Sequence, residues 1–309
     1  MIKPIHIGNL KLENNIFLAP MAGVNCPAFR LLCKGYGAGL VYTQMYDSHS
    51  LVGTDPNNFL QIFEKERPVA IQLVGSKPEI MQKAAEVLNN YADVIDLNFG
   101  CPDADVLANK AGAFFLKHPE QLERVVKAVL KASEKPVTAK IRSGWEDVNA
   151  LKVAKMLEDY SIAAISIHPR TKKQGFSGKS DWNIIKQLKE KINIPIIGNG
   201  DVTDAITAKK MFEKTNCDAI MVGRAAIGNP LIFENIIKSQ DKTPSLEEKK
   251  KIFKKFLIYY EQQSRQNYSE LKQHALWFFK SIRQAKSIKH HITKLDSKEE
   301  LLSYIDSLE

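Results

Sequence analysis

The chain has 309 residues, 44% of them hydrophobic and 26% charged, with a formal net charge of +9. This length and hydrophobic content suffice for one large α/β barrel with a small appendage. The N-terminus lacks the apolar core of a signal peptide and no apolar run reaches the length of a membrane span, so we expect a cytoplasmic protein with no membrane partner. Four scattered cysteines without CxxC spacing argue against a zinc knuckle or a disulfide framework and favour reduced thiols.

Short apolar strands alternate with helical segments over the first two-thirds of the chain. Apolar residues recur at three- and four-residue spacing in 78–88 and 119–130, which is typical of helices. Eight short strands, each followed by a helical segment, are typical of a (β/α)8 TIM barrel, with a doubly wound parallel sheet as the alternative. The expected strands are 16–19, 40–43, 69–73, 94–97, 137–141, 164–167, 194–197 and 218–222.

Two further segments flank this pattern. Residues 5–12 predict a hairpin with a Gly-Asn turn that closes the N-terminal end of the barrel. Residues 239–245 are polar and end in Pro-Ser, which predicts a linker followed by a helix cap. Only helical periodicity follows. We therefore expect a catalytic barrel domain over 1–240 and a small helical domain over 245–309.

The residues that follow the strands are the candidates for chemistry, because ligands bind at the C-terminal ends of barrel strands. Asn98-Phe99-Gly100-Cys101-Pro102 leaves a carboxamide and a thiol at this lip, although a free cysteine is more often a small buried hydrophobe. Small residues in Ala19-Pro20-Met21-Ala22-Gly23 would let a flat ring lie against backbone. Other strands end with Gln72, Lys140, Arg142, His168 and Arg170.

Two glycine-rich turns indicate a phosphorylated ligand. Gly198-Asn199-Gly200-Asp201 and Gly223-Arg224 follow the last two strands, where backbone N–H groups at helix starts can bind phosphate. Lys140 lies in an otherwise apolar strand, and an unpaired buried lysine is costly, so it requires an anionic or electron-accepting partner. A flavin would fit, because a cation near its N1 and O2 stabilises the reduced ring. We find no set of metal ligands.

Several motifs, in order along the whole barrel, resemble those of the tRNA-dihydrouridine synthases, and 272–280 resembles the tRNA-binding helical domain of that family. The matching segments are 19–24, 28–30, 96–102, 140–145, 168–171, 198–202 and 223–226.

The resemblance implies an enzyme that uses FMN, with NADPH or NADH as reductant, to reduce the C5–C6 double bond of selected tRNA uridines. By this analogy Cys101 is the general acid that protonates C5 while flavin N5 delivers hydride to C6, and Asn98, Arg142 and Arg170 bind the substrate. A thiol suits this role because it is largely protonated at neutral pH yet acidic enough to give a proton. The implied flavin-binding residues are Pro20, Met21, Ala22, Gln72, Lys140, His168, Asn199, Gly200, Asp201, Gly223 and Arg224.

Three positions depart from the family pattern. Asn25 and Cys26 stand where Thr-Asp is common, and Asp105 stands where many members carry lysine after the catalytic Cys-Pro. For this reason, the tRNA position that better-known relatives reduce does not tell us which uridine this protein would reduce.

The segment Lys272–Lys294 is strongly basic and contains no acidic residue. Cations that grip phosphate, with aromatics that pack the helix or stack on bases, would suit a tRNA partner, and the net charge of +9 agrees with a polyanionic one. The alternative is a solvated lysine face over an ordinary core. The residues expected to bind tRNA are Lys272, Lys280, Arg283 and Lys286.

Two other functions compete with this interpretation. A dihydroorotate-dehydrogenase-like flavoenzyme would share the fold and the flavin, but it would not need the basic helical appendage. A non-catalytic tRNA-binding barrel would not need Cys101, Asn98 and Lys140. The sequence does not determine the oligomeric state, and we expect a monomer.

Overall fold

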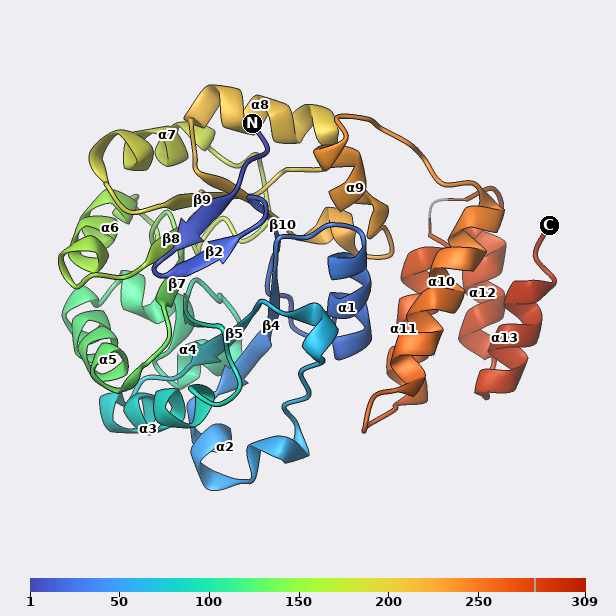
Figure 1. Ribbon diagram of the computed structural model, residues 1–309, viewed down its shortest axis with the longest axis horizontal. Coiled ribbons are helices and arrows are strands. Elements are labelled where there is room, and N and C mark those ends of the chain that lie inside the picture. The colour runs from blue at the N-terminus through green and yellow to red at the C-terminus, as the bar shows by residue number, and fades with distance from the viewer. Residues whose placement is uncertain (281) are drawn as a thin grey trace.

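The computed structural model describes residues 1–280 and 282–309. It consists of a barrel surrounded by helices and a separate group of helices beside it, as Figure 1 shows in a view along the barrel.

The barrel is closed and its eight strands are all parallel, which confirms the predicted TIM barrel and excludes the doubly wound sheet. Strand β10 pairs with β3 and completes the ring. The strands are β3 (Ile16–Leu18), β4 (Leu40–Asp47), β5 (Val69–Val74), β6 (Val94–Phe99), β7 (Val137–Arg142), β8 (Ala164–His168), β9 (Ile196–Asn199) and β10 (Ala219–Val222).

The strand ends differ from the predicted ones, most of them by one or two residues, and the differences in β9 and β4 have local reasons. Strand β9 begins at Ile196 rather than at 194, after Pro195, a residue that has no N–H to donate to a strand ladder. Strand β4 continues past 43 to Asp47 through a shift in register between Tyr42 and Met45. Asp47 then accepts from the N–H groups of the next helix, so the strand ends in a helix cap.

Amphipathic helices cover the outside of the barrel. Helix α5, for example, buries Leu122, Val125, Val126 and Val129 against the strands at three- and four-residue spacing. The helices around the barrel are α1 (Pro27–Gly35), α2 (Ser48–Gly53), α3 (Pro78–Leu88), α4 (Ala104–Ala108), α5 (Pro119–Ala132), α6 (Ala150–Asp159), α7 (Trp182–Lys191), α8 (Ala205–Thr215) and α9 (Leu231–Ile237).

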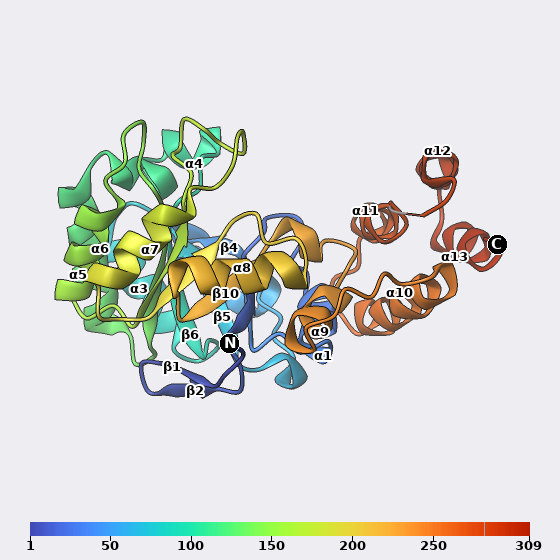
Figure 2. The ribbon, with the colours of Figure 1, turned by 90° about the horizontal axis from the view of Figure 1, so that it is seen from above.

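The predicted N-terminal hairpin is confirmed. Strands β1 (Ile5–Ile7) and β2 (Leu10–Leu12) pair antiparallel, and Gly8 takes the left-handed conformation (φ 60°) that the tight turn needs. Ile7 and Leu12 are buried in one cluster with the side chains that fill the barrel interior. Figure 2 shows the hairpin at one end of the barrel and α4 at the other, so the strand ends beside α4 are left to bind ligands.

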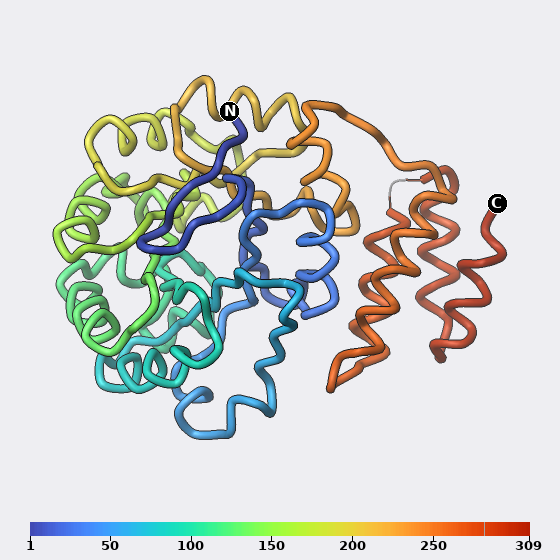
Figure 3. Tube along the Cα trace, in the orientation of Figure 1, coloured from blue at the N-terminus to red at the C-terminus, as the bar shows by residue number. Residues whose placement is uncertain are grey.

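The chain leaves the barrel through a polar segment, traced in Figure 3, and continues in four helices. Ser245 caps the first of them, and its side chain and that of Glu248 bond to each other's backbone N–H, as the predicted cap requires. The helices are α10 (Leu246–Glu261), α11 (Tyr268–Phe278), α12 (Ala285–Lys294) and α13 (Lys298–Asp306). None of the described helices is long and apolar enough to cross a membrane.

These helices dock on the barrel beside the loop that follows β3. The Ala28 N–H donates to Gln263 Oε1 at 2.8 Å, and Cys26 Sγ lies 3.5 Å from Nε2 of the buried His274. Gly228 has φ 68° and lies so close to α11 that a Cβ there would be 2.2 Å from the Trp277 carbonyl oxygen. The docking therefore depends on a residue without a side chain.

We predict that Gly228→Ala loosens this docking. A left-handed alanine costs about 1–2 kcal/mol before the clash with α11 is counted. Thermal denaturation followed by circular dichroism should show a lower midpoint than the wild type. Gly178→Ala is the control, because Gly178 is also left-handed (φ 63°) but no neighbouring side chain or backbone atom lies within 4 Å of the added Cβ. Equal midpoints for the two variants would contradict this account of the interface.

Candidate active site

A cavity of about 650 Å³ opens where the barrel strands end. Side chains from loops far apart in the sequence meet there because the closed barrel brings all its strand ends to one rim. Of the barrel residues singled out from the sequence, Pro20, Met21, Ala22, Gln72, Asn98, Cys101, Lys140, Arg142, His168, Asn199, Gly200, Asp201, Gly223 and Arg224 line the cavity.

Cys101 differs from the other three cysteines, which are all buried, because its thiol is partly exposed at the cavity. The loop that carries it is fixed at both ends. Asn98 Oδ1 accepts from the N–H groups of Gly100 (3.1 Å) and Cys101 (2.8 Å), and the Cys101 carbonyl accepts from Ala113 N at 2.9 Å. Partial burial raises the pKa of the Cys101 thiol, so the thiol keeps its proton at neutral pH.

Lys140 and His168 both line the cavity, and several positively charged side chains surround them. Burial, reinforced by the Arg142 charge, lowers the pKa of Lys140 to about 8. The pKa of His168 falls well below its usual range, first because it is buried and then because Lys140, Arg142 and other cations surround it. His168 is therefore neutral, and Lys140 is the cation that a ligand in the cavity would meet.

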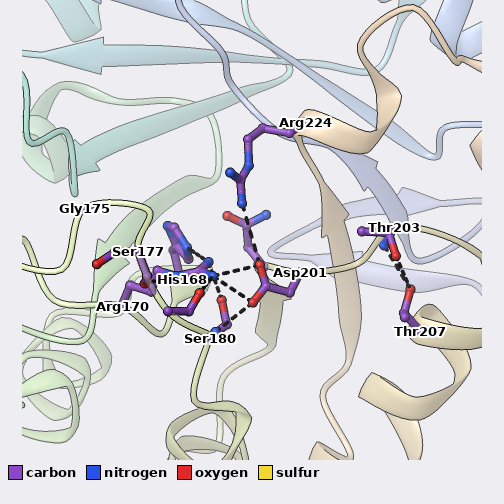
Figure 4. A network of polar contacts seen from close by, with 12 residues as sticks. His168, Arg170, Gly175, Ser177, Ser180, Asp201, Thr203, Thr207 and Arg224 are labelled. Carbon is purple, nitrogen blue, oxygen red and sulfur yellow. Dashed lines mark hydrogen bonds and ion pairs between the residues drawn. The ribbon is translucent and has the colours of Figure 1, made fainter. Parts of the chain in front are cut away.

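Arg142 and Arg170, expected to bind substrate, both hold the loop that follows β8. Arg142 is buried at the cavity wall and donates to the carbonyls of Gly100 and Gly175, both at 2.8 Å. Arg170 does not line the cavity. It is buried behind it, where it pairs with Asp201 at 2.8 Å and donates to Ser180 Oγ at 2.8 Å (Figure 4). These bonds give each arginine a role in positioning the loop.

The turn after β9 has a left-handed backbone and passes close to Ser180. Gly200 and Asp201 both have positive φ, 111° and 58°, and a Cβ at Gly200 would come within 2.4 Å of Ser180 Oγ. The Asp201 carboxylate accepts hydrogen bonds from the Arg170 guanidinium and the Ser180 N–H (Figure 4). Arg224 Nη2 lies 3.6 Å from Asp201 Oδ1. The Asp201 charge is thus paired, and Arg224, with a half-exposed side chain, can meet an anion.

Phe176 is a member of the site that our reading of the sequence missed. Its side chain is 59% exposed at the cavity, and its ring lies 5.5 Å from the Arg142 guanidinium and 4.9 Å from that of Arg224. The available signal was a single phenylalanine in the otherwise polar stretch 172–180. Exposed aromatics at the mouth of a cavity offer a surface on which a planar ring can stack.

The four basic residues of the helical domain that were expected to bind tRNA differ in their exposure to solvent. Lys280, Arg283 and Lys286 are exposed, whereas Lys272 donates to the Leu295 carbonyl at 2.6 Å and is half-buried. Phe278 and Phe279 pack in the core around Phe253, so these two aromatics support the fold. Residue 281 of the basic segment lies outside the described residues.

We predict that iodoacetamide modifies the native protein slowly at neutral pH and faster as the pH rises, because the thiolate is the reactive form. Peptide mass analysis should place the label on Cys101, since Cys26, Cys33 and Cys217 are buried. Labelling of Cys101 that is already complete and fast at pH 7 would contradict the raised pKa. The Cys101→Ala variant controls for labelling of the buried thiols.

The fold and cavity define a class: a TIM barrel whose cavity, at the strand ends, combines a partly exposed thiol, cations and two glycine-containing turns. Solved structures with this fold include morphinone reductase (TM-score 0.59, 16% identity, 78% of this chain and 90% of that chain). Another is an old yellow enzyme homologue from Zymomonas mobilis (TM-score 0.58, 15% identity, 79% of this chain and 94% of that chain). At these identities the likeness establishes the fold.

Sequence comparison is more specific. The family model described as dihydrouridine synthase (Dus) matches residues 17–308. The tRNA-dihydrouridine synthase B of Pasteurella multocida is 40% identical over 79% of this chain and 77% of its own length. The tRNA-dihydrouridine synthase B of Vibrio vulnificus is 35% identical over 98% and 99%. The chain therefore belongs to the dihydrouridine synthase family, which confirms the resemblance stated from the motifs.

Proposed function

We propose that this protein reduces the C5–C6 double bond of uridines in tRNA, with bound FMN as the redox group and NADPH or NADH as its reductant. The observation that carries the proposal is a partly exposed, protonated thiol at Cys101 in one cavity with Lys140 and the glycine turns. The relatives' names as tRNA-dihydrouridine synthases support the same substrate.

The residues around the cavity fit FMN. The turns at Gly200 and Gly223, with Arg224, would hold the phosphate, and the small residues at 19–22 leave a flat wall for the ring. Gln72 and Lys140 would face the polar edge of the ring. A volume of about 650 Å³ falls within the ~300–1,000 Å³ usual for such ligand sites. Bound flavin would supply the hydride.

Cys101 would supply the proton. Saturating a C=C bond adds one hydride and one proton. The Cys101 thiol retains its proton at neutral pH, and we assign it the role of the acid. The hydrogen bonds from the Gly100 and Cys101 N–H groups to Asn98 Oδ1 fix the backbone at Cys101. This restricts the positions that the Cys101 thiol can take in the cavity. The thiolate left behind would be stabilised by the positive charges of Arg142 and Lys140.

A uridine inside a folded tRNA reaches this cavity only if it leaves its stack. Phe176, at the mouth and between two arginines, offers a stacking surface for the extruded base, and Arg224 offers a charge for its phosphate. The exposed Lys280, Arg283 and Lys286 of the helical domain would bind phosphates elsewhere on the tRNA.

We predict that Cys101→Ala still binds FMN and still accepts electrons from NADPH, yet loses tRNA reduction by about 10²–10⁴-fold, the usual contribution of a general acid. Flavin absorbance reports the first two properties, and mass analysis of dihydrouridine in unmodified tRNA reports the third. Cys217→Ala is the control, because that thiol is buried away from the cavity. If Cys101→Ala reduced tRNA at the wild-type rate, the thiol would not be the proton donor.

We also predict that reversing the charges of Lys280, Arg283 and Lys286 to Glu weakens tRNA binding and leaves flavin reduction by NADPH unchanged. For every tRNA phosphate that the variant no longer binds, the log–log salt dependence of binding should become shallower by about 0.7–0.9. The control reverses Lys152, Lys186 and Lys210, which are exposed on α6, α7 and α8, so the net charge changes equally. An equal loss of affinity in both variants would show a general charge effect and contradict the assignment.

A further inference from the structure

A buried carboxylate beneath the cavity is connected to the Cys101 loop through two side-chain amides. Gln72 Nε2 donates to Asp96 Oδ2 at 2.7 Å, and Asn98 Nδ2 donates to Gln72 Oε1 at 2.8 Å. Asn98 Oδ1 in turn accepts from the Cys101 N–H at 2.8 Å. Asp96 is fully buried and Gln72 is 2% exposed, so water does not compete for these bonds.

Both ends of this chain of bonds require the same amide orientations. The backbone N–H of Cys101 can only donate, so Asn98 must turn its oxygen toward it and its nitrogen toward Gln72. Gln72 must then present its oxygen to Asn98 and its nitrogen to Asp96, where an ionised carboxylate can only accept. Neither amide can flip without placing donor against donor.

Asp96 is itself held in place. Thr138 Oγ1 donates to its second carboxylate oxygen at 2.6 Å, so both oxygens have partners. Burial raises the pKa of Asp96 to about 6, which still leaves the carboxylate ionised at neutral pH, and the Lys140 charge lies close enough to favour that form. The sequence hides this residue within the apolar run Val94-Ile95-Asp96-Leu97 of β6.

We propose that Asp96 is a positioning residue for the reaction: through Gln72 and Asn98 it fixes the orientation of the loop that carries Cys101. The inference rests on the proposed role of Cys101 as proton donor.

A consequence for substrate recognition follows from the fixed amide. The second N–H of Asn98 points at Met45 Sδ, 3.5 Å away in the cavity wall, and a thioether is a weak acceptor. Because Asn98 Oδ1 is occupied by backbone N–H groups, the side chain offers an incoming ring a donor. The cavity side of Asn98 therefore presents a hydrogen-bond donor and no free acceptor.

The test compares Asp96→Leu, which removes the acceptor, with Asp96→Asn, whose oxygen can still accept from Gln72. Ser166→Ala is the matched control, because Ser166 is fully buried in the neighbouring strand β8 and its hydroxyl has no hydrogen-bond partner among the described residues. Two quantities are measured on each FMN-loaded protein: the alkylation rate of Cys101 by iodoacetamide, and kcat and KM for tRNA.

In Asp96→Leu we expect faster alkylation of Cys101, because its loop loses the fixed anchor, and a kcat about 10- to 100-fold below that of Asp96→Asn. This range corresponds to leaving one buried amide unpaired. The KM for tRNA should stay within about threefold, since charge contacts elsewhere dominate binding. Asp96→Asn and Ser166→Ala should be alkylated at the wild-type rate.

If Asp96→Leu folds and shows the wild-type alkylation rate and kcat, the proposal is overturned. It is also overturned if kcat falls equally in Asp96→Leu and Asp96→Asn, because the charge of Asp96 alone would then explain the loss. Should Asp96→Leu fail to fold, Thr138→Val decides the matter: it removes one bond from Asp96 without changing shape, and alkylation must rise by about threefold. Alkylation that follows this pattern in a protein inactive on tRNA would refute the proposed function while leaving the positioning role of Asp96 intact.

Discussion

The site depends on one constraint: several positively charged side chains lie close together at the C-terminal ends of the barrel strands. Lys140, Arg142, Arg170 and Arg224 all act on His168, and together with burial they keep its ring neutral. Burial and the Arg142 charge also bring the pKa of Lys140 to about 8, so it holds its proton weakly. Such a cluster is costly without compensating charge, and an anionic or electron-accepting ligand in the cavity would relieve it.

Two carboxylates offset this charge, Asp201 at the cavity wall and the fully buried Asp96 behind it. Asp201 pairs with Arg170, and Asp96 lies beneath Lys140 and stabilises its charged form. Both are engaged in hydrogen bonds with protein groups, so the cations that line the cavity remain available to a ligand. The charge that a phosphate or a reduced ring brings would therefore meet Lys140 and Arg224, as the proposed cofactor requires.

Much of this could be predicted from the sequence, because strand ends and glycine turns are local signals. The closed barrel brings Asn98, Cys101, Lys140 and Gly200 to one cavity, as expected from their positions after strands. What a side chain contacts after the chain closes is not local, so Arg170 was expected at the substrate but lies behind the wall.

Lys272 and Phe176 also show that contacts between distant parts of the chain cannot be predicted from the sequence pattern. Lys272 was expected to bind tRNA but is engaged in the fold, whereas Phe176 was not expected at the cavity but lines it. Lys272 counts as a free cation in the sequence, but its ammonium group satisfies a carbonyl at the end of α12. Phe176 lies in a loop whose path is set by Arg142 and Arg170, each through bonds to loop carbonyls, and no periodicity predicts where such a loop leads. Loop positions depend on these distant bonds, which the linear pattern does not contain.

The central claim is that electrons pass from a nicotinamide through bound flavin to a tRNA uridine. The most direct measurement reduces the FMN-loaded protein with NADPH without oxygen, removes excess reductant, and adds tRNA lacking dihydrouridine. The account predicts that flavin absorbance returns while one or more uridines gain two hydrogen atoms by mass analysis. Flavin that stays reduced with tRNA, or is reoxidised without any change in uridine mass, would contradict it.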